Sequence, residues 1–283
     1  MANTFDSLRR QATFSLREHG IKNADIDVRI LLGFAAGYSD ADLIAQRNAQ
    51  ISPSELEIFN RYLERRMAHE PIAYITQQKE FFSLSFHVNS HVLIPRPETE
   101  GLVEHALTLI SDTKSPKILD VGTGSGAILI SLLHDRKDAS GLGVDIYEPA
   151  LDIAKKNAHS LGVNEQCKFI YSDYLQKVTD CYDLLVSNPP YITDKAMQEL
   201  DGTVKSYEPH LALRGGADGL SPYRNILRAA PAVLKARGCL VFEIGYDQGQ
   251  TVSNLVEQAG FKDVKIIQDL AGHDRIISAK KQE

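Results

Sequence analysis

The sequence predicts an α/β fold preceded by a small helical domain, and three observations indicate this. After residue 110, short apolar runs alternate with helical stretches, which is typical of a parallel sheet covered by helices on both faces. The first 70 residues follow helical spacing instead. With 283 residues, 43% of them hydrophobic and 24% charged, the chain has ordinary globular composition and enough length for two unequal domains.

Residues 1–70 are expected to form a helical domain that docks the substrate. The apolar face of its first helix is made of Phe5, Leu8, Ala12 and Leu16. Asn23 can cap a second helix that is apolar nearly all round, which predicts a central place in a small bundle. The segment Ser52–Glu55 is a capping box with proline at the first helical position, and it predicts the start of a further helix.

The character of the chain changes at Glu70-Pro71. Residues 71–97 contain the β-prone run Ala73-Tyr74-Ile75 and two aromatic runs, and they predict a β-hairpin linker. Residues 98–283 are expected to form the sheet domain, which begins with a helix over 98–110. The expected strands are 117–121, 140–145, 167–171, 182–187, 239–244, 262–267 and 275–279, and the expected helices are 126–135, 148–161, 221–236 and 248–259. No helix separates the last two strands, so the final strand should run antiparallel.

Composition bears on location and partners. The 31 basic and 37 acidic residues give a net charge of −6, which counts against a protein that mainly grips a phosphate backbone. The three cysteines are far apart and fit neither a disulfide framework nor a zinc spacing, so no metal is expected. The apolar runs are too short to span a bilayer, and the N-terminus lacks a signal core. A cytoplasmic location is therefore expected, without membrane attachment.

A glycine-rich segment, Asp120–Gly126, lies where the first strand of the sheet turns into its helix. Glycines at such a turn let a ligand approach the backbone and the helix N–H groups. Asp145 ends the second strand, where a carboxylate can accept the hydroxyl hydrogens of a ribose. Because nicotinamide enzymes use the same pair of features, the two together predict a nucleoside-bearing cofactor without identifying it.

Asp173 and Tyr174 follow the third strand at the same edge of the sheet. The aspartate could accept a hydrogen bond from the amine of adenine, and the tyrosine ring could cover the base. The alternative is a loop aspartate beside a half-buried tyrosine, with no ligand.

The most specific motif is Asn188-Pro189-Pro190-Tyr191, which leaves the fourth strand. The two prolines hold the backbone extended, and their carbonyls accept without a competing N–H. Asn188 adds a side-chain acceptor, and Tyr191 adds a flat ring. This set fits a planar –NH2 group, whose two N–H bonds need two acceptors.

These motifs together resemble class I S-adenosylmethionine-dependent methyltransferases that modify an –NH2 nitrogen. The segments Glu80–Leu84, Ile94–Glu100 and Tyr207–Gly219, with the helical N-terminal domain, narrow the resemblance to the HemK-type glutamine methyltransferases of peptide chain release factors, over nearly the whole chain. The resemblance implies a seven-stranded, mostly parallel, Rossmann-like methyltransferase sheet. It also implies S-adenosylmethionine as cofactor and a release factor, presenting glutamine in a Gly-Gly-Gln loop, as the partner.

The resemblance also implies a role for each motif residue. Gly122, Thr123, Gly124, Ser125 and Gly126 would hold the methionine end of the cofactor, Asp145 the ribose, and Asp173 and Tyr174 the adenine. Asn188, Pro189, Pro190 and Tyr191 would form the glutamine pocket, with Asn188, Pro189 and Tyr191 acting in catalysis and Asn188 also bordering the cofactor. Position 174 is often a different aromatic residue in this family. Arg96 and Glu98 would either help close the site or form a plain salt bridge.

Three other functions remain open on the motifs. A glutamine methyltransferase acting on a ribosomal protein would share every motif. An adenine amino-methyltransferase would meet the same –NH2 geometry, but it needs to grip phosphates, and no basic cluster serves this. A nicotinamide oxidoreductase would leave Asn188–Tyr191 unexplained. We expect a monomer that binds release factors and does not bind nucleic acid directly.

Overall fold

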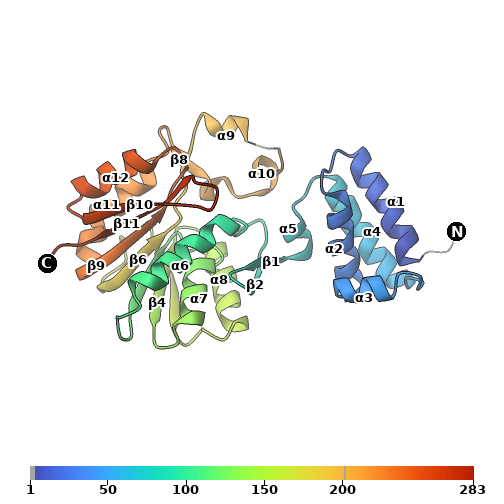
Figure 1. The fold of residues 1–283 in the computed structure, drawn as a ribbon, viewed down its shortest axis with the longest axis horizontal. Coiled ribbons are helices and arrows are strands. Elements are labelled where there is room, and N and C mark those ends of the chain that lie inside the picture. The colour runs from blue at the N-terminus through green and yellow to red at the C-terminus, as the bar shows by residue number, and fades with distance from the viewer. Residues whose placement is uncertain (1–3, 201) are drawn as a thin grey trace. The chain divides into compact units, whose positions relative to one another are not determined.

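A computed structural model gives the fold and describes residues 4–200 and 202–283. The chain divides into two compact units, Met1–Gln78 and Lys79–Glu283. The first is helical, and the second contains a seven-stranded sheet, which confirms the predicted α/β class with a helical N-terminal region (Figure 1). Within the described residues, no helix is long and apolar enough to cross a membrane.

The first unit is a set of short helices around one apolar core. They are α1 (Phe5–Glu18), α2 (Ala24–Ala36), α3 (Asp40–Ala45), α4 (Pro53–Met67) and α5 (Ile72–Thr76). The predicted capping box of α4 is confirmed: Ser52 accepts from the Glu55 N–H, and the Glu55 side chain accepts from the Ser52 N–H. A second box, Ser39 with Asp42, opens α3, which was not predicted. Each box satisfies N–H groups that the start of a helix leaves unpaired.

Two predictions for the first unit are wrong. Helix α2 does not lie at the centre of the bundle with other helices on all sides, because its Ile26 and Phe34 are 50% and 41% exposed. Residues 72–76 form helix α5 rather than a strand. The β-prone side chains Tyr74 and Ile75 are buried by this helical turn, and Ile75 joins the core of the unit. Burial of side chains therefore overrides their β propensity.

The sheet of the second unit has the order β10-β11-β9-β6-β3-β4-β5. Its strands are β3 (Lys117–Val121), β4 (Ser140–Asp145), β5 (Cys167–Tyr171), β6 (Tyr182–Ser187), β9 (Leu234–Glu243), β10 (Lys262–Gln268) and β11 (Asp274–Lys280). Strands β5, β4, β3, β6 and β9 are parallel, and β11 runs antiparallel to both of its neighbours, as predicted. The connection from β3 leads to β4 on one side, and β6 lies on its other side. The strand order thus changes direction beside β3, which is where open α/β sheets bind ligands.

Helices cover both faces of this sheet (Figure 1). One face carries α6 (Glu100–Leu109), α7 (Ala127–Asp135) and α8 (Glu148–Ser160), and the other carries α11 (Ser221–Val233) and α12 (Gly249–Gln258). All five lie close to their predicted ranges. Helix α11 ends earlier than predicted because Leu234 already pairs with Tyr182 in the sheet.

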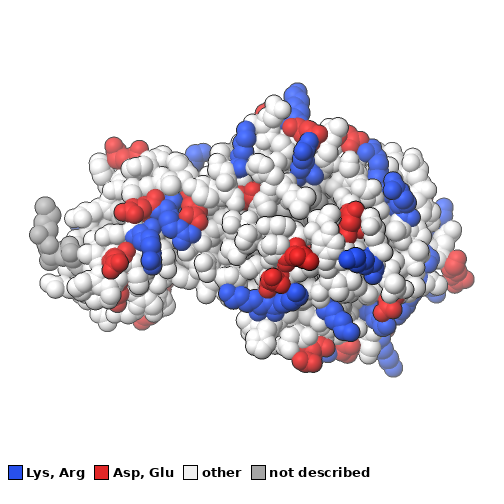
Figure 2. All heavy atoms as spheres, turned by 180° about the vertical axis from the view of Figure 1, so that it is seen from behind, with Lys and Arg blue, Asp and Glu red and all other residues white. Residues whose placement is uncertain are grey.

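Some short elements lie outside the sheet. Residues 78–87 form the predicted hairpin, with β1 (Gln78–Phe81) and β2 (Leu84–His87), although it is shorter than the expected linker. The elements that were not predicted are η1 (Pro97–Thr99), β7 (Ile192–Thr193), α9 (Ala196–Glu199), α10 (Gly202–Tyr207), η2 (His210–Ala212) and β8 (Arg214–Gly216). All but η1 lie between β6 and α11. On the face drawn in Figure 2, basic and acidic side chains are interspersed.

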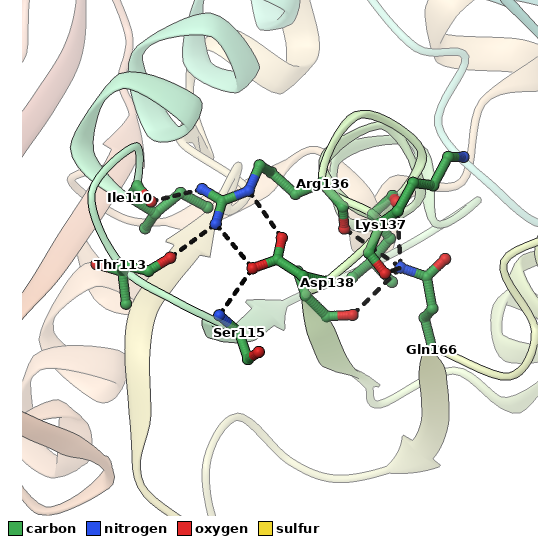
Figure 3. Close-up of polar contacts among 9 residues, drawn as sticks. Ile110, Thr113, Ser115, Arg136, Lys137, Asp138 and Gln166 are labelled. Atoms are coloured by element: carbon green, nitrogen blue, oxygen red, sulfur yellow. Dashed lines mark hydrogen bonds and ion pairs between the residues drawn. The ribbon is translucent and has the colours of Figure 1, made fainter.

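A polar network closes the amino-terminal edge of the sheet, opposite the carboxyl ends of β3, β4 and β5 (Figure 3). The Arg136 guanidinium donates to the carbonyls of Ile110 and Thr113 and to the Asp138 carboxylate. Asp138 also accepts from the Ser115 N–H at 2.8 Å. The Gln166 amide donates to carbonyls of the same loop. These bonds join the loops that enter all three strands.

Candidate active site

A cavity of about 240 Å³ opens at the carboxyl ends of β3, β4 and β6 in the second unit. The predicted site residues that line it are Gly122, Thr123, Gly124, Ser125, Asp145, Asp173, Tyr174, Asn188, Pro189 and Pro190. Gly126 and Tyr191 lie outside this lining. The structure thus brings most of the predicted residues to one hollow, although they come from four separate loops.

The glycine loop joins β3 to α7 in a left-handed conformation. Gly122 and Gly124 have φ of 74° and 55°, and a Cβ on either would meet no atom within 4 Å, so both border open space. Gly126 differs, because a Cβ there would lie 2.7 Å from Ile130 Cδ1 and 3.3 Å from Ala154 Cβ. Gly126 has a φ of 80° and lies against Ala154 of α8, while the first two glycines leave room for a ligand.

Asp145 holds this loop at the end of β4. Its carboxylate accepts from the Gly124 N–H at 2.9 Å and from the Tyr147 N–H at 3.0 Å. Burial raises the pKa of Asp145, and these backbone hydrogen bonds act in the opposite direction. Each carboxylate oxygen has a further lone pair, so the side chain can still accept from a ligand in the cavity.

Asp120 lies beneath the loop. It is the first residue of the segment Asp120–Gly126, and the sequence predicted no role for it. It is fully buried, and its Oδ2 accepts from the Thr123 hydroxyl at 2.7 Å. Its Oδ1 has no hydrogen-bond partner among the described residues. Burial, with a smaller effect from the Asp145 charge, raises the pKa of Asp120 to about 7.

Asp173 and Tyr174 occupy the loop after β5, and both line the cavity. Asp173 accepts from the Gln176 side chain at 2.9 Å. Tyr174 has a φ of 47°, which is uncommon for a residue with a side chain, and its ring packs partly against the core. The cavity-lining position agrees with a role toward a base, and the packing agrees with the alternative of a half-buried tyrosine.

The segment Asn188–Tyr191 leaves β6 at the centre of the sheet edge. The preceding Ser187 hydroxyl donates to the Val121 carbonyl at 2.6 Å and ties β6 to the glycine strand. Asn188 Nδ2 donates to Thr99 Oγ1 at 3.3 Å. Asn188, Pro189 and Pro190 therefore face the cavity from a firmly held strand end.

Tyr191 is not among the residues that line the cavity. Its ring packs partly against the core, and burial raises its phenol pKa. Its carbonyl accepts from Gln248 Nε2 at 3.4 Å, and a Cβ at Gly219 would lie 2.4 Å from that carbonyl oxygen. The structure thus gives Tyr191 contacts that position its own backbone, and the ring does not form a wall of this cavity.

Arg96 borders the cavity and forms an ion pair with Glu208 at 2.6 Å. Glu208 is 5% exposed, and its Oε2 has no partner among the described residues. The ion pair joins the segment before α6 to the segment after α10, and both segments line the cavity. Arg96 thus forms a salt bridge at the border of the cavity, and its part in closing the site stays a prediction. Glu98 lies outside the lining.

Sequence reasoning missed two polar residues beside Asn188. Thr99 lines the cavity and is 5% exposed, and Glu243, at the end of β9, is 2% exposed. Thr99 belongs to the segment Ile94–Glu100 that supported the family resemblance, so a signal for it was present. No sequence pattern marked Glu243.

Two family models match the chain. The PrmC N-terminal domain matches residues 7–76, and the Methyltransferase small domain matches residues 99–206. Among solved structures, a methyltransferase from Pyrococcus furiosus superposes with a TM-score of 0.54 at 16% identity, over 79% of this chain and 99% of that chain. A likeness at this identity shows the fold alone.

Curated relatives extend over nearly the whole length. The release factor glutamine methyltransferase of Caulobacter vibrioides is 39% identical over 267 residues, which is 94% of this chain and 92% of that protein. That of Cereibacter sphaeroides is 41% identical over 271 residues, which is 96% of each. The predicted resemblance is therefore confirmed, and the chain belongs to the family of release factor glutamine methyltransferases.

Proposed function

We propose that this chain transfers a methyl group from S-adenosylmethionine to the side-chain amide nitrogen of the Gly-Gly-Gln glutamine of peptide chain release factors. The observation that carries this proposal is the Asn188-Pro189-Pro190 exit of β6, which lines the same cavity as the glycine loop and Asp145. The names of the relatives, with identities near 40% over most of both chains, support the substrate.

The residues of the cavity fit this cofactor. The open space above Gly122 and Gly124 suits the methionine end, and Asp145 retains lone pairs for ribose hydroxyls. Asp173 and Tyr174 would then lie beside the adenine. The bound cofactor would supply an electrophilic methyl group on a positively charged sulfur.

Asn188 and Pro189 would act on the substrate amide. An amide nitrogen is a poor nucleophile, because its lone pair is delocalised into the carbonyl. Asn188 Oδ1 and the Pro189 carbonyl would accept the two N–H bonds and aim the lone pair at the methyl group. Since positive charge develops on the nitrogen during transfer, these acceptors bind the transition state more tightly than the ground state.

Charge supports a protein substrate over nucleic acid. The first 75 residues contain nine Lys and Arg against ten Asp and Glu, and basic and acidic side chains are interspersed on the face in Figure 2. A nucleic-acid enzyme needs a basic surface for phosphates. A release factor as substrate agrees with a cytoplasmic reaction.

Mass spectrometry of purified release factor, incubated with the protein and S-adenosylmethionine, tests the proposal. We expect one added methyl group on the glutamine of the Gly-Gly-Gln loop, and none on a release factor whose glutamine is replaced by alanine. Methylation of a ribosomal protein alone would keep the chemistry and change the partner. Methylation of adenine alone would contradict the proposal.

A further inference from the structure

Three side chains from separate segments meet beside the cavity at the carboxyl edge of the sheet. Ser187 pairs with Phe242 in the parallel β6–β9 ladder, so Asn188 and Glu243 are the next residues of that register. Thr99 reaches the same place from η1. Thr99 and Asn188 line the cavity, whereas Glu243 lies behind them.

The carboxyl group of Glu243 determines which end of the Asn188 amide faces the cavity. Burial raises the pKa of the Glu243 carboxyl to about 7, and above that pH the ionised carboxylate only accepts hydrogen bonds. An asparagine amide, by contrast, has a donor end and an acceptor end. Asn188 Nδ2 donates to Thr99 Oγ1 at 3.3 Å. The Thr99 and Asn188 side chains both lie close enough to the Glu243 carboxyl to lower its pKa, against the larger effect of burial. The donor end of Asn188 is thereby engaged away from the ligand, and its Oδ1 is left for the cavity.

Glu243 has no evident reason to be there for stability alone. Its side chain is buried, and its Oε2 has no hydrogen-bond partner among the described residues. Arg275 attracts the carboxylate, but that arginine also pairs with Asp269, and the nearby Glu98 charge repels it. A buried and incompletely paired acid destabilises a fold, so its presence needs a functional explanation.

We infer that Glu243, with Thr99, is a positioning residue that fixes the Asn188 amide with its oxygen toward the substrate. The inference rests on the proposed function and deepens it. Asn188 Oδ1 and the Pro189 carbonyl are both acceptors, so they bind the –NH2 of glutamine and repel the carboxylate of glutamate. The pair therefore makes the site selective for an amide through an unfavourable contact with the acid.

The test uses the full-length protein with Glu243→Gln at pH 8, where Glu243 of the wild type is ionised. A glutamine at this position can donate to Asn188 Oδ1, so the Asn188 amide can turn and offer its –NH2 to the ligand. We expect turnover at saturating cofactor to fall about tenfold or more, with cofactor affinity unchanged. We also expect a release factor carrying glutamate in place of the target glutamine to inhibit the variant about tenfold better, relative to its inhibition of wild type.

Matched variants separate orientation from charge and from folding. Glu98→Gln removes a neighbouring charge without touching Asn188, and it should leave the preference for glutamine over glutamate unchanged. Glu257→Gln makes the same chemical change on the exposed side of α12 and should leave turnover unchanged. If Glu243→Gln does not fold, Thr99→Val should lose about tenfold in turnover and Thr99→Ser should restore it.

Several outcomes would overturn the inference. These are wild-type turnover in Glu243→Gln, lost turnover without any gain in binding of the glutamate-containing factor, or an equal gain in Glu98→Gln. A substrate-independent readout is the NMR signal of the Asn188 side-chain amide, whose hydrogens should be protected from exchange in wild type and lose protection in Glu243→Gln. A wild-type protein that ignores release factors but shows this protected signal would contradict the proposed substrate and retain the positioning role.

Discussion

The Asp145 side chain both organises the glycine loop and faces the cavity. Because it can accept from ribose hydroxyls as a charged group, Asp145→Ala should weaken S-adenosylmethionine binding by about 2–3 kcal/mol. Titration calorimetry on the purified variant measures this. Asp152→Ala, on the exposed face of α8, is the matched control and should bind like wild type. Unchanged affinity in Asp145→Ala would remove this residue from the cofactor site.

Asn188 is proposed to act on the substrate amide and not on the cofactor, so its removal should lower turnover much more than cofactor affinity. Asn188→Ala should lower turnover about a hundredfold, the scale for losing one preorganised group that acts in the transition state. Cofactor affinity should fall much less. Single-turnover kinetics at saturating cofactor measure the effect, with Asn254→Ala on α12 as control. Methyl transfer at the wild-type rate would contradict the role given to Asn188.

Residue types and spacing were enough to identify the segments Asp120–Gly126 and Asn188–Tyr191, because each motif is contiguous in the chain. Glu243 could not be found in this way. Its significance depends on β9 lying beside β6, and periodicity does not give strand order. The aromatic ring of Tyr191 predicts a stacking surface for the substrate, and in the structure this ring packs partly against the core, so its role stays a prediction.

At the scale of elements, the buried parallel strands were predicted well because they are apolar on both faces. The short elements between β6 and α11 were not, since they depend on partners distant in sequence. Ile192 of β7 pairs with Arg214 of β8, and the Arg214 guanidinium also donates to Asp194 at 2.6 Å. Such contacts leave no local pattern.

The loop network in Figure 3 supports a prediction about pH and strand entry. Hydrogen bonds from Arg136 and the Ser115 N–H lower the pKa of Asp138 to about 2. A lowered pKa means that the ionised acid stabilises the fold above its ordinary pKa, near 4, and that this contribution is lost as pH falls toward about 2. Asp138→Asn should therefore lower the urea midpoint at pH 7, with a smaller difference from wild type near pH 3. An equal difference at both pH values would contradict this account.

At the scale of the whole molecule, two buried acids should make stability fall with rising pH. Burial raises the pKa of both Asp120 and Glu243 to about 7. Between their ordinary pKa, near 4, and about 7, the folded chain holds protons that the unfolded chain has released. The contribution of these two acids to stability is therefore greatest below pH 4 and is lost as pH rises through 7. Each difference of one in pKa corresponds to about 1.4 kcal/mol, which gives an effect of a few kcal/mol per acid.

Urea unfolding at pH 5 and pH 8 measures this decline. Asp120→Asn and Glu243→Gln should each flatten it, mainly by raising stability at pH 8. The acids whose pKa is lowered, such as Asp138, titrate below this window and do not obscure the result. A decline in both variants as steep as in wild type would show that neither acid is protonated in the folded state.

The division into two units gives the last prediction. All the residues that line the cavity belong to the second unit, so a chain beginning at Lys79 should still bind S-adenosylmethionine. The first unit, with its nearly balanced charge, is proposed to grip the release factor, because a side chain of one glutamine offers little surface for recognition. The shortened chain should therefore methylate whole release factor poorly, while calorimetry shows cofactor affinity close to that of the full chain.

Methylation assays with several substrates test whether the second unit binds the cofactor while the first unit binds the release factor. With radiolabelled cofactor, full-length protein should label release factor and should not label DNA or RNA oligonucleotides, even at low salt, where phosphate contacts are strongest. Equal labelling of release factor by the full and shortened chains would remove the docking role from the helical unit. Loss of cofactor binding in the shortened chain, together with loss of its folded signal, would instead show that the second unit depends on the first for its stability.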